Sequence, residues 1–505
     1  MSATETIETV HYLDRLRRIM ALDPSVWAIE FRDETASWSD LAAVSEDLAA
    51  ALSAAGVGTE LSVGVVLKNR PASALAVVGL LLSGHSIVLL NPMQPEGKLA
   101  AEIEQLKLAA VVARGEDWTP ALVAGAKAAG SRVLVVDLAA QPKVALYPEL
   151  SAAGAGPFRA ADPATQIEIQ TSGTTGAPKR ILITRATVES ALVDGVRSEG
   201  GKEIRLQRSP NFLFAPLPHT AGILQLLMSF YEGRPVMLFE RFDIAEFRRA
   251  LTRHRPRFIS LLPAILRTVL QSDLTREEMS SVIAVRSGSA ALSPDAQREF
   301  EDRFGAPVLC NYGATEFLGV VASWTYEEHK KWGRAKLGSA GRARRGTKFR
   351  IVDQETFAPL PTGERGLLEV DATSLGLKPG WTRTTDIASL DADGFLYVHG
   401  RSDDAIIRGG FKILATQVAE VIRSAPGVAD ALVVGIPDER LGEVPVCAVE
   451  LQPGAEVTEA GLTAFARENL TSYQVPAKFR IVEKLPRTIS MKVSLPEVRK
   501  LFATS

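Results

Sequence analysis

An alternation of helix-like and strand-like segments over roughly the first 140 residues is the feature that most constrains the fold. Residues 38–56 and 72–84 have apolar side chains at helical spacing or form a compact apolar run, whereas 61–67, 85–91 and 131–138 are short apolar stretches. Strands that alternate with helices are typical of βαβ units, so we expect a largely parallel sheet. A second set of this kind spans 212–313, with helices expected at 222–232 and 243–254 and a strand at 257–263.

The character of the chain changes after about residue 335. Short β-rich segments separated by Gly and Pro, such as 363–370 and 394–400, indicate a small barrel or distorted sheet. The last hundred residues or so, after the polar "GRSDD", resemble a compact α+β unit. We therefore predict an α/β protein whose large N-terminal domain (1–400) holds two α/β subdomains and a β-rich subdomain, followed by a small mobile α+β domain (401–505).

Composition excludes several classes of protein. The chain has 505 residues, enough for roughly two to four domains, and its formal net charge of −2 gives no field that would attract nucleic acid or an anionic membrane. The most apolar run, from Ala72, is about a dozen residues, well short of the roughly 20 that span a bilayer. Cys310 and Cys447 match no metal-ligand spacing and fit a reducing compartment. With no signal-peptide pattern at the N-terminus, we expect a cytoplasmic enzyme.

The stretch "TSGTTGAPKR" at 171–180 is the most distinctive loop. Its glycines allow several backbone N–H groups to face one side, its hydroxyls add donors, and Lys179 adds a charge, so it can cradle phosphate oxygens. It is not a Walker A loop, because Gly173 and Gly176 are too close and Pro178 precedes the lysine. On local chemistry alone a surface turn is an equal alternative.

Six further motifs follow in order: "APLPHTAGI" (215–223), "SGSAAL" (287–292), "NYGATE" (311–316), "TTD" (384–386), "GRSDDAIIRGG" (400–410) and "LPRTISMK" (485–492). Together with the phosphate loop they resemble the signatures of the adenylate-forming superfamily, which includes acyl-CoA synthetases, luciferases and adenylation domains of peptide synthetases. The resemblance covers about residues 25–500. It implies that a carboxylate attacks the α-phosphorus of ATP, giving an acyl-adenylate and pyrophosphate, a reaction that depends on positioning and cations.

The resemblance assigns roles residue by residue. It implies that the β- and γ-phosphates are bound by Thr171, Ser172, Gly173, Thr174, Thr175, Gly176 and Lys179. It gives the walls of the adenine slot to Ser289, Ala290, Ala291, Asn311 and Tyr312, with Tyr312 stacked on the base. Thr315 would bond the α-phosphate, Glu316 would help to hold Mg²⁺, Asp386 would accept the ribose hydroxyls and Arg401 would bond the ribose and phosphate side.

Each motif also has a plainer interpretation. "GATE" could cap a helix, "SGSAAL" could be a strand-to-helix turn with Pro294 at the helix start, and a lone Asp386 or Arg401 is usually a solvated charge. Three departures from the superfamily pattern stand out: Thr385 and Met491 occupy positions of usual glycines, and Arg180 adds a cation near the phosphates.

The C-terminal segment carries the remaining assignments. By resemblance Lys492 bridges the substrate carboxylate and the α-phosphate, a role that suits an ammonium with three donors; the alternative is a surface lysine. Asp403 matches the hinge between the domains, and Gly409 and Gly410 match the loop that lines the entry of the thiol substrate.

By resemblance His219 flanks the acid pocket, whose expected lining residues are mostly apolar or small. Its lining residues are His219, Thr220, Ala221, Leu224, Ser287, Gly288, Gly313, Phe317 and Leu318. No acidic residue lies near His219 to pair with an amino-acid ammonium, so an uncharged acyl or aryl tail is favoured. His219 as a core histidine bonded to backbone is the alternative.

Coenzyme A is the first choice of acceptor, with ATP and Mg²⁺ as the other small molecules. A carrier-protein thiol or an amine is the first alternative, and a non-catalytic nucleotide-binding protein is the alternative of another class. A phosphotransferase that releases ADP fails because the Walker loop is absent. The sequence leaves open which carboxylic acid is used, the pathway and the oligomeric state, for which a homodimer is possible.

Overall fold

The computed structural model describes most of the chain. The described residues are 11–147, 150, 154, 156–171, 179–198, 203–314, 317, 319–344, 346–373, 379–402, 405–408, 411–438, 441–487 and 493–503. Contacts divide the chain into two compact units: the first comprises Met1–Ser260, Ser272–Val285 and Ala314–Gly319, and the second comprises Leu261–Gln271, Arg286–Gly313 and Val320–Ser505.

A seven-stranded sheet forms the centre of the first unit, in the order β7-β6-β5-β3-β4-β8-β9. The five central strands are parallel, whereas β7 and β9 are antiparallel edges, so the predicted largely parallel sheet is confirmed. The strands are β3 (Val63–Val66), β4 (Ile87–Leu90), β5 (Ala110–Arg114), β6 (Arg132–Val136), β7 (Val144–Leu146), β8 (Thr165–Thr171) and β9 (Lys179–Thr184). All residues of β3 and β4 are buried, as expected for parallel strands covered on both faces.

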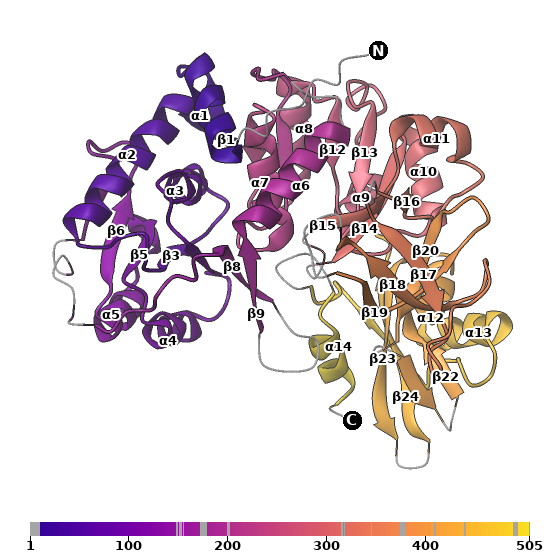
Figure 1. Ribbon diagram of the computed structural model, residues 1–505. Helices are drawn as coiled ribbons and strands as arrows, with labels where there is room; N and C mark the ends of the chain where they lie inside the picture. Colours follow the sequence, from indigo (N-terminus) through magenta and orange to yellow (C-terminus); the bar gives the residue numbers. More distant parts are fainter. Residues whose placement is uncertain are drawn as a thin grey trace. The chain divides into compact units, whose positions relative to one another are not determined.

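Helices cover both faces of this sheet (Figure 1). On one face α4 (Glu96–Leu106) packs against α5 (Pro120–Ala129) so closely that a Cβ at Gly125 would lie 2.5 Å from the Ala100 carbonyl oxygen. On the other lie α2 (Trp38–Ala54) and α3 (Pro71–Leu82). A short 3₁₀ turn, η1 (Gly115–Asp117), precedes α5.

The apolar run from Ala72 forms α3, a helix whose twelve residues are all buried. Pro71 occupies its first turn, where the missing N–H costs nothing, and Gly84 follows its end with φ +85°. The predicted buried helix is therefore confirmed. Among the described residues, the helices are all too short or too polar to cross a bilayer.

The second sheet of the first unit joins segments that are far apart in the sequence. Its order is β10-β11-β1-β2, and β1 runs parallel to β11 although some two hundred residues separate them. The strands are β1 (Trp27–Phe31), β2 (Glu34–Ser37), β10 (Asn211–Leu213) and β11 (Val236–Leu238). The pattern of 212–313 did not predict this recruitment of the N-terminal hairpin, because pairing between distant segments leaves no periodicity.

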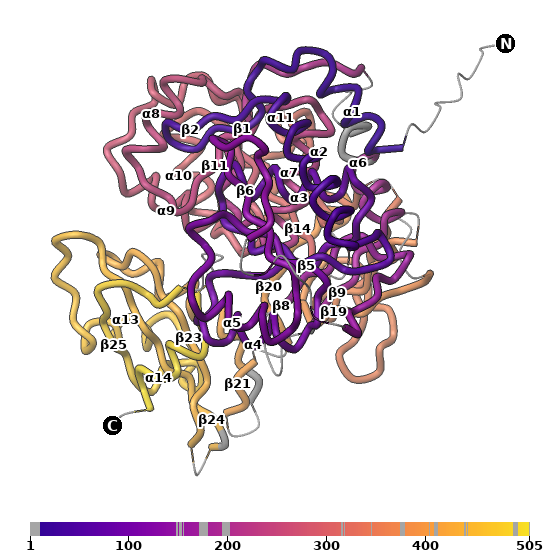
Figure 2. The backbone as a smooth tube through the Cα atoms, turned by 90° about the vertical axis from the view of Figure 1, so that its left-hand side faces the viewer, coloured from indigo at the N-terminus to yellow at the C-terminus, as the bar shows by residue number. Residues whose placement is uncertain are grey.

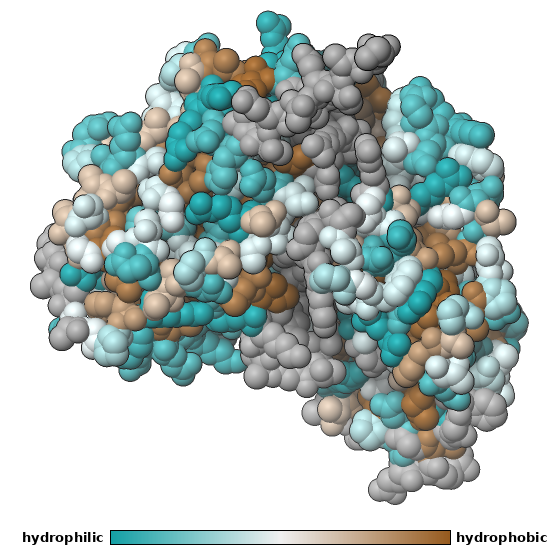
Figure 3. Space-filling view, in the orientation of Figure 1, coloured by the Kyte–Doolittle hydropathy of each residue, from teal (hydrophilic) through white to brown (hydrophobic). Residues whose placement is uncertain are grey.

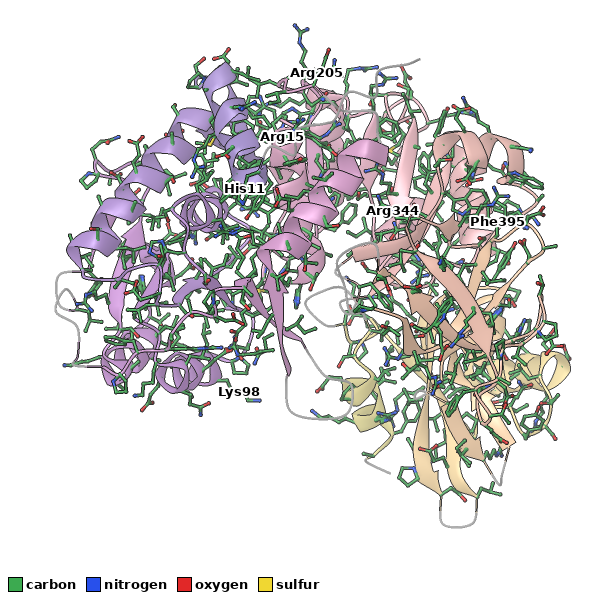
Figure 4. All side chains as sticks on the ribbon, viewed as in Figure 1. His11, Arg15, Lys98, Arg205, Arg344 and Phe395 are labelled. Carbon is green, nitrogen blue, oxygen red and sulfur yellow. The ribbon has the colours of Figure 1, made fainter. Side chains whose placement is uncertain are left out.

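The remaining elements of the first unit are the strands β12 (Phe258–Ser260) and β13 (Ala284–Ser287), the latter continuing into the second unit, and the helices α1 (Tyr12–Leu22), α6 (Arg185–Ser198), α7 (Thr220–Tyr231) and α8 (Ile244–His254). The helices predicted at 222–232 and 243–254 are thus present within two residues. Arg15 points from α1 toward α7 (Figure 4) and donates from Nε to the Tyr231 carbonyl at 2.8 Å.

The second unit begins with α9 (Pro263–Gln271) and contains the predicted β-rich region. Its next elements are α10 (Pro294–Phe304), β14 (Val308–Ala314, whose last residue belongs to the first unit), β15 (Gly319–Ser323), α11 (Tyr326–Trp332) and β16 (Arg342–Ala343). An antiparallel sheet follows, with β17 (Lys348–Val352), β18 (Gly366–Asp371), β19 (Trp381–Leu390) and β20 (Leu396–Arg401) in sequence order. Phe395, labelled in Figure 4, is buried against Trp324 with ring centroids 4.6 Å apart.

The C-terminal sheet has the order β22-β21-β24-β23, and β25 pairs with β24. Its strands are β21 (Ala405–Arg408), β22 (Phe411–Leu414), β23 (Val428–Asp438), β24 (Gly442–Leu451) and β25 (Lys478–Val482). The helices are α12 (Ala415–Arg423), α13 (Glu459–Asn469) and α14 (Leu495–Phe502), and Figure 2 shows α13 and α14 beside these strands. Because successive strand residues face opposite sides, α12 and α13 pack on Val433 and Val449, whereas α14 packs on Val434 and Ala448.

Apolar surface is distributed in the way that is usual for a folded chain. On the face shown in Figure 3, the coloured residues form brown patches interspersed with teal. The large exposed apolar side chains among the described residues include Trp381, at 38% exposure, and Phe357, at 43%. Both rings are covered on one face by a guanidinium, from Arg350 and Arg383 respectively, and surface rings of this kind need no special explanation.

Candidate active site

The strands β19 and β20 bring together two of the predicted nucleotide-binding residues. Asp386 and Arg401 are directly opposite each other in the antiparallel register. The Tyr312 hydroxyl, which comes from β14, donates to Asp386 Oδ2 at 2.5 Å, and the Asp386 N–H donates to Thr384 Oγ1 at 3.1 Å. A carboxylate, a guanidinium and a phenol are thus held by strand register and one short hydrogen bond.

The position of Thr385, where the superfamily motif usually has glycine, does not require glycine in this chain. It lies within β19, its carbonyl accepts a hydrogen bond from Ser402 N at 2.7 Å, and its backbone is not left-handed. A β-branched residue is well suited to such an extended position. Thr385 therefore occupies an extended strand position, at a point where the pairing between β18 and β19 shifts register.

The turn from β13 to α10 presses against the same strand, β14. A Cβ at Gly288 would lie 2.1 Å from Asn311 Oδ1, so any other residue there would displace the Asn311 amide, and Ser289 adopts a left-handed φ of +68°. Ser293 caps α10 by accepting from Ala296 N, and Pro294 stands in its first turn. The structure thus realises the strand-to-helix turn, while Ala290 and Ala291 are exposed and can face a ligand.

Ser287 ends β13 with a buried hydroxyl. Its side chain is 2% exposed, and its Oγ has no hydrogen-bond partner among the described residues. An orphaned hydroxyl at a predicted ligand-facing position fits a polar group supplied by a bound molecule.

His219 stands at the N-terminal end of α7. Its N–H donates to the Pro216 carbonyl at 3.1 Å, and its side chain is half-buried, as are those of Thr220 and Leu224. Gly222 is packed on the preceding turn, since a Cβ there would lie 2.1 Å from the Pro216 oxygen. Phe317, another predicted pocket residue, is buried at 4% exposure, and Gly313 lies in β14.

The predicted phosphate loop lies between β8 and β9, and Thr171 and Lys179 are paired at the end of the hairpin next to it. Arg180, the cation expected near the phosphates, donates to Glu168 Oε1 at 3.1 Å and also pairs with Glu102. Glu168 is 4% exposed and receives two further hydrogen bonds from Arg159, at 3.1 and 2.6 Å. The charge of Arg180 is therefore engaged by protein carboxylates.

Several predicted site residues lie outside the described part of the chain. They are Ser172, Gly173, Thr174, Thr175, Gly176, Thr315, Glu316, Leu318, Asp403, Gly409, Gly410 and Lys492. The structure describes the residues on either side of two of these segments. Arg408 and Phe411, next to Gly409 and Gly410, pair in the β21–β22 hairpin, and Arg487 forms a β-bridge with Val493, the residue after Lys492.

Burial sets the protonation states of one histidine and of both cysteines. Burial lowers the pKa of His399 to about 4, with Arg365 acting in the same direction, so this imidazole is neutral at pH 7. Burial also raises the pKa of the Cys310 thiol to about 12 and raises that of Cys447, which makes both poor nucleophiles. Among the described residues no group of three or more His, Cys, Asp or Glu side chains is arranged to hold a metal ion.

Sequence reasoning missed the carboxylates that support these segments, chiefly the buried Glu168 and Asp430 and the partly buried Glu450. The signal for the two buried acids was a single acid between apolar neighbours, Glu168 in "IEI" of β8 and Asp430 in "ADALVVGI" of β23. A charged residue on the buried face of a strand needs an oppositely charged or hydrogen-bonding partner. A single acid in such a strand therefore predicts a nearby arginine or another donor.

Comparison with known proteins identifies the family of the chain. The AMP-binding enzyme family matches residues 16–376, and its C-terminal domain matches residues 417–492. The sulfoacetate–CoA ligase of Cupriavidus necator is 30% identical over 476 residues, which cover 90% of each chain. The 2-succinylbenzoate–CoA ligase of Bacillus subtilis is 28% identical over 498 residues, covering 95% of this chain and 96% of the relative.

Solved structures share the fold. The o-succinylbenzoate CoA synthetase of Bacillus subtilis, in complex with its acyl-adenylate intermediate, has a TM-score of 0.77 at 26% identity and covers 96% of this chain and 97% of its own. ATP-bound MatB from Rhodopseudomonas palustris has a TM-score of 0.81 at 23% identity, with 97% and 99% covered. The match to the family extends over well more than half of the chain, and the chain belongs to the AMP-binding enzyme family.

Proposed function

We propose that this chain is an AMP-forming acid–thiol ligase. A carboxylate oxygen of the acid attacks the α-phosphorus of ATP, and the bond from that phosphorus to the pyrophosphate oxygen breaks. The thiolate of coenzyme A then attacks the carbonyl carbon, AMP leaves, and the thiol proton passes to solvent. Curated relatives that align over nine-tenths of the chain are CoA ligases, which supports the acid–thiol class.

The single observation that carries the proposal is the arrangement of Asp386, Arg401 and Tyr312. A carboxylate is an acceptor-only group that can bind two neighbouring hydroxyls, as a ribose presents them. A guanidinium opposite it suits phosphate oxygens, and the phenol bonded to Asp386 fixes both the carboxylate and its own ring. These are the groups that a nucleoside monophosphate needs.

Binding of the other reacting groups is assigned by resemblance. Residues 171–176 and Lys179 hold the departing pyrophosphate, Thr315 bonds the α-phosphate, and Lys492 bridges the two anions as they approach. Mg²⁺, held in part by the oxygens of Glu316, supplies charge neutralisation on the phosphates when it is bound.

The thioester step uses the small domain, whose boundary with the large domain we place at residues 400 and 401. The two family matches end at 376 and resume at 417, on either side of this position. Asp403 acts as a torsional hinge, and Gly409 with Gly410 leaves room for the pantetheine arm. Two free and buried cysteines fit the cytoplasmic location that we propose.

The acid is the least defined part. Half-buried Thr220 and Leu224 beside His219 favour an uncharged acyl or aryl tail. Relatives act on acids as different as sulfoacetate and long-chain fatty acids, so the substrate panel has to include acids with a second anionic group. His219→Ala should change the acid preference more than the KM for ATP.

The test is pyrophosphate release with ATP, Mg²⁺ and a panel of aliphatic, aryl and dianionic acids, with and without CoA, and with hydroxylamine as a competing acceptor. We expect release with one acid class, AMP as the nucleotide product and rapid turnover only with CoA. Acid-dependent release that hydroxylamine accelerates and CoA does not would move the acceptor to an amine or a carrier thiol. ADP as product, or no release with any acid, would contradict the proposal.

A further inference from the structure

Two acidic residues face each other in the C-terminal sheet. Asp430 of β23 is the direct cross-strand partner of Glu450 of β24. Like charges directly opposite on neighbouring strands are destabilising, and Asp430 is only 4% exposed, so its charge also has little water. The pairs that follow along the same strands, such as Ala431 with Val449, are apolar.

Arginines converge on Asp430 from three other segments. Arg487 Nη2 lies 2.7 Å from Oδ2, Arg423 Nε lies 2.9 Å from Oδ1, and Arg267 Nη2 lies 3.7 Å from Oδ2. The backbone N–H of Ala431 also donates to Oδ1 at 2.9 Å. Burial alone would raise the pKa of Asp430, but the three guanidinium groups outweigh it and lower the pKa, so the carboxylate is charged at pH 7.

Both acids hold the same short stretch of chain. Glu450 Oε2 accepts from Leu485 N at 2.9 Å, two residues before Arg487, which Asp430 binds. Backbone contacts also hold the chain after Lys492. Arg487 forms a β-bridge with Val493, and Ser494 N donates to the Pro486 carbonyl at 2.8 Å. Residues 488–492, which end in Lys492, lie between these ties and outside the described residues.

We propose that Asp430 and Glu450 are positioning residues for adenylation, which fix residues 485–487 and so set the place from which Lys492 acts. The proposal rests on the proposed function, in which Lys492 bridges the two reacting anions. A bridging ammonium is sensitive to placement, since a displacement of about 1 Å can cost about a hundredfold in rate.

Stability alone does not account for this arrangement. An apolar pair of similar volume in a buried position is often as stable as a buried ion pair, or more so. In the two strands, acids occupy the cross-strand pair that contacts residues 485–487, namely Asp430 and Glu450. The next pairs, Ala431–Val449 and Leu432–Ala448, are apolar. We therefore attribute the two acids to the need to hold residues 485–487, and not to the stability of the sheet itself.

The experiment separates the two half-reactions. Adenylation is followed as acid-dependent exchange between pyrophosphate and ATP, and thioester formation is followed with presynthesised acyl-adenylate and CoA. We expect Asp430→Asn to lower the kcat of adenylation by about 10- to 100-fold, with the KM values for acid and ATP changed by less than about threefold. Thioester formation should stay within about threefold of wild type.

A matched pair of variants distinguishes positioning from stability. Arg487→Met and Arg423→Met each remove one guanidinium from Asp430, so both should lower the temperature of unfolding. Only Arg487 belongs to the segment that leads to Lys492, so only Arg487→Met should lower the kcat of adenylation. Arg487→Lys, which keeps a cation near Asp430, should retain part of the kcat that Arg487→Met loses. The double variant Asp430→Asn/Arg487→Met should have a kcat of adenylation only slightly below that of Arg487→Met alone, because both changes remove the same contact.

The outcomes are distinct. If Arg423→Met and Arg487→Met reduce both half-reactions equally, in step with lost stability, the positioning role is wrong while the proposed function stands. If the wild-type enzyme catalyses no acid-dependent exchange, or if Lys492→Ala retains it, the proposed function or its lysine assignment fails, and the positioning role fails with it.

Discussion

Two buried carboxylates, Glu168 and Asp430, support two of the segments to which the chemistry is assigned, but they are held in different ways. Glu168, next to the phosphate loop, binds Arg180 from the neighbouring strand and Arg159 from the chain that enters β8. Asp430 binds arginines from α9, from the end of α12 and from the chain after β25. The first cluster lies around one hairpin, with Glu102 added from α4, whereas the second is a junction of three segments that are far apart in the sequence.

The charge balance differs as well. Arg180 is shared between Glu168 and Glu102, so two arginines meet two carboxylates. At Asp430, three arginines meet one carboxylate directly, and Glu450 uses an oxygen to bind a backbone N–H. The comparison indicates that the Glu168 cluster stabilises a hairpin, while the Asp430 cluster specifies where a segment is placed. The following predictions test that difference, from the largest expected effect to the smallest.

The lysine beyond the Asp430 junction should matter most for chemistry. Lys492→Ala is expected to lower adenylation by about 10²–10³-fold, the usual cost of losing one donor to a developing anion. Thioester formation from supplied acyl-adenylate should survive. Lys179→Ala, in the other segment, should act chiefly on the KM for ATP. Half-reaction kinetics measure both, and a Lys492→Ala variant with normal adenylation would contradict the assignment.

Removing the carboxylate of the hairpin cluster should act on stability. Glu168→Ala removes a buried carboxylate and leaves Arg159, which is a third exposed, and part of Arg180 without a partner, which should cost about 2–3 kcal/mol. Chemical denaturation measures the loss. Glu116→Ala is the control, because Glu116 is an exposed partner of Arg114 and should change stability by less than about 1 kcal/mol. Equal effects of the two variants would show that the Glu168 cluster adds little.

The Asp430 junction should weaken in acid. Its pKa is below the ordinary value when the protein is folded, so its stabilisation is present above the unfolded-state pKa near 4 and is lost as pH falls through the folded value. The free energy of unfolding of wild type should exceed that of Asp430→Asn by about 2 kcal/mol at pH 7. The gap should narrow below pH 4, and a gap that instead widens in acid would contradict the direction of the shift.

Arg180 should give the smallest effect. Because its guanidinium already binds two carboxylates, Arg180→Gln is expected to cost about 1–3 kcal/mol of stability and to change the KM for ATP by less than about threefold. A tenfold or larger increase in that KM would mean that the guanidinium contacts the nucleotide phosphates after all.

Local pattern predicted the elements of the fold better than their pairing. Although β5 was not predicted as a strand, the buried helix α3 and the parallel strands β3, β4 and β6 follow from apolar spacing and from Gly and Pro punctuation. The addition of β1 to β11 does not, because register between distant segments has no local signature.

The same distinction applies to the candidate site. The motifs named Asp386, Arg401 and Tyr312, but the hydrogen bond from Tyr312 to Asp386 and the orphaned hydroxyl of Ser287 arise from strands that meet only in the folded chain. Thr385 was flagged because the motif usually has glycine at this position, but the backbone there is an extended strand that accepts a β-branched residue.

Gly222 has a consequence for anyone who wishes to redesign the acid specificity of this enzyme. With the Pro216 oxygen only 2.1 Å from where a Cβ would be, no larger residue can enter without moving the start of α7, and His219 with it. Thr220 and Leu224 are half-buried and carry no such restriction. A mutant library aimed at new acids should therefore randomise 220 and 224 and leave 222 untouched.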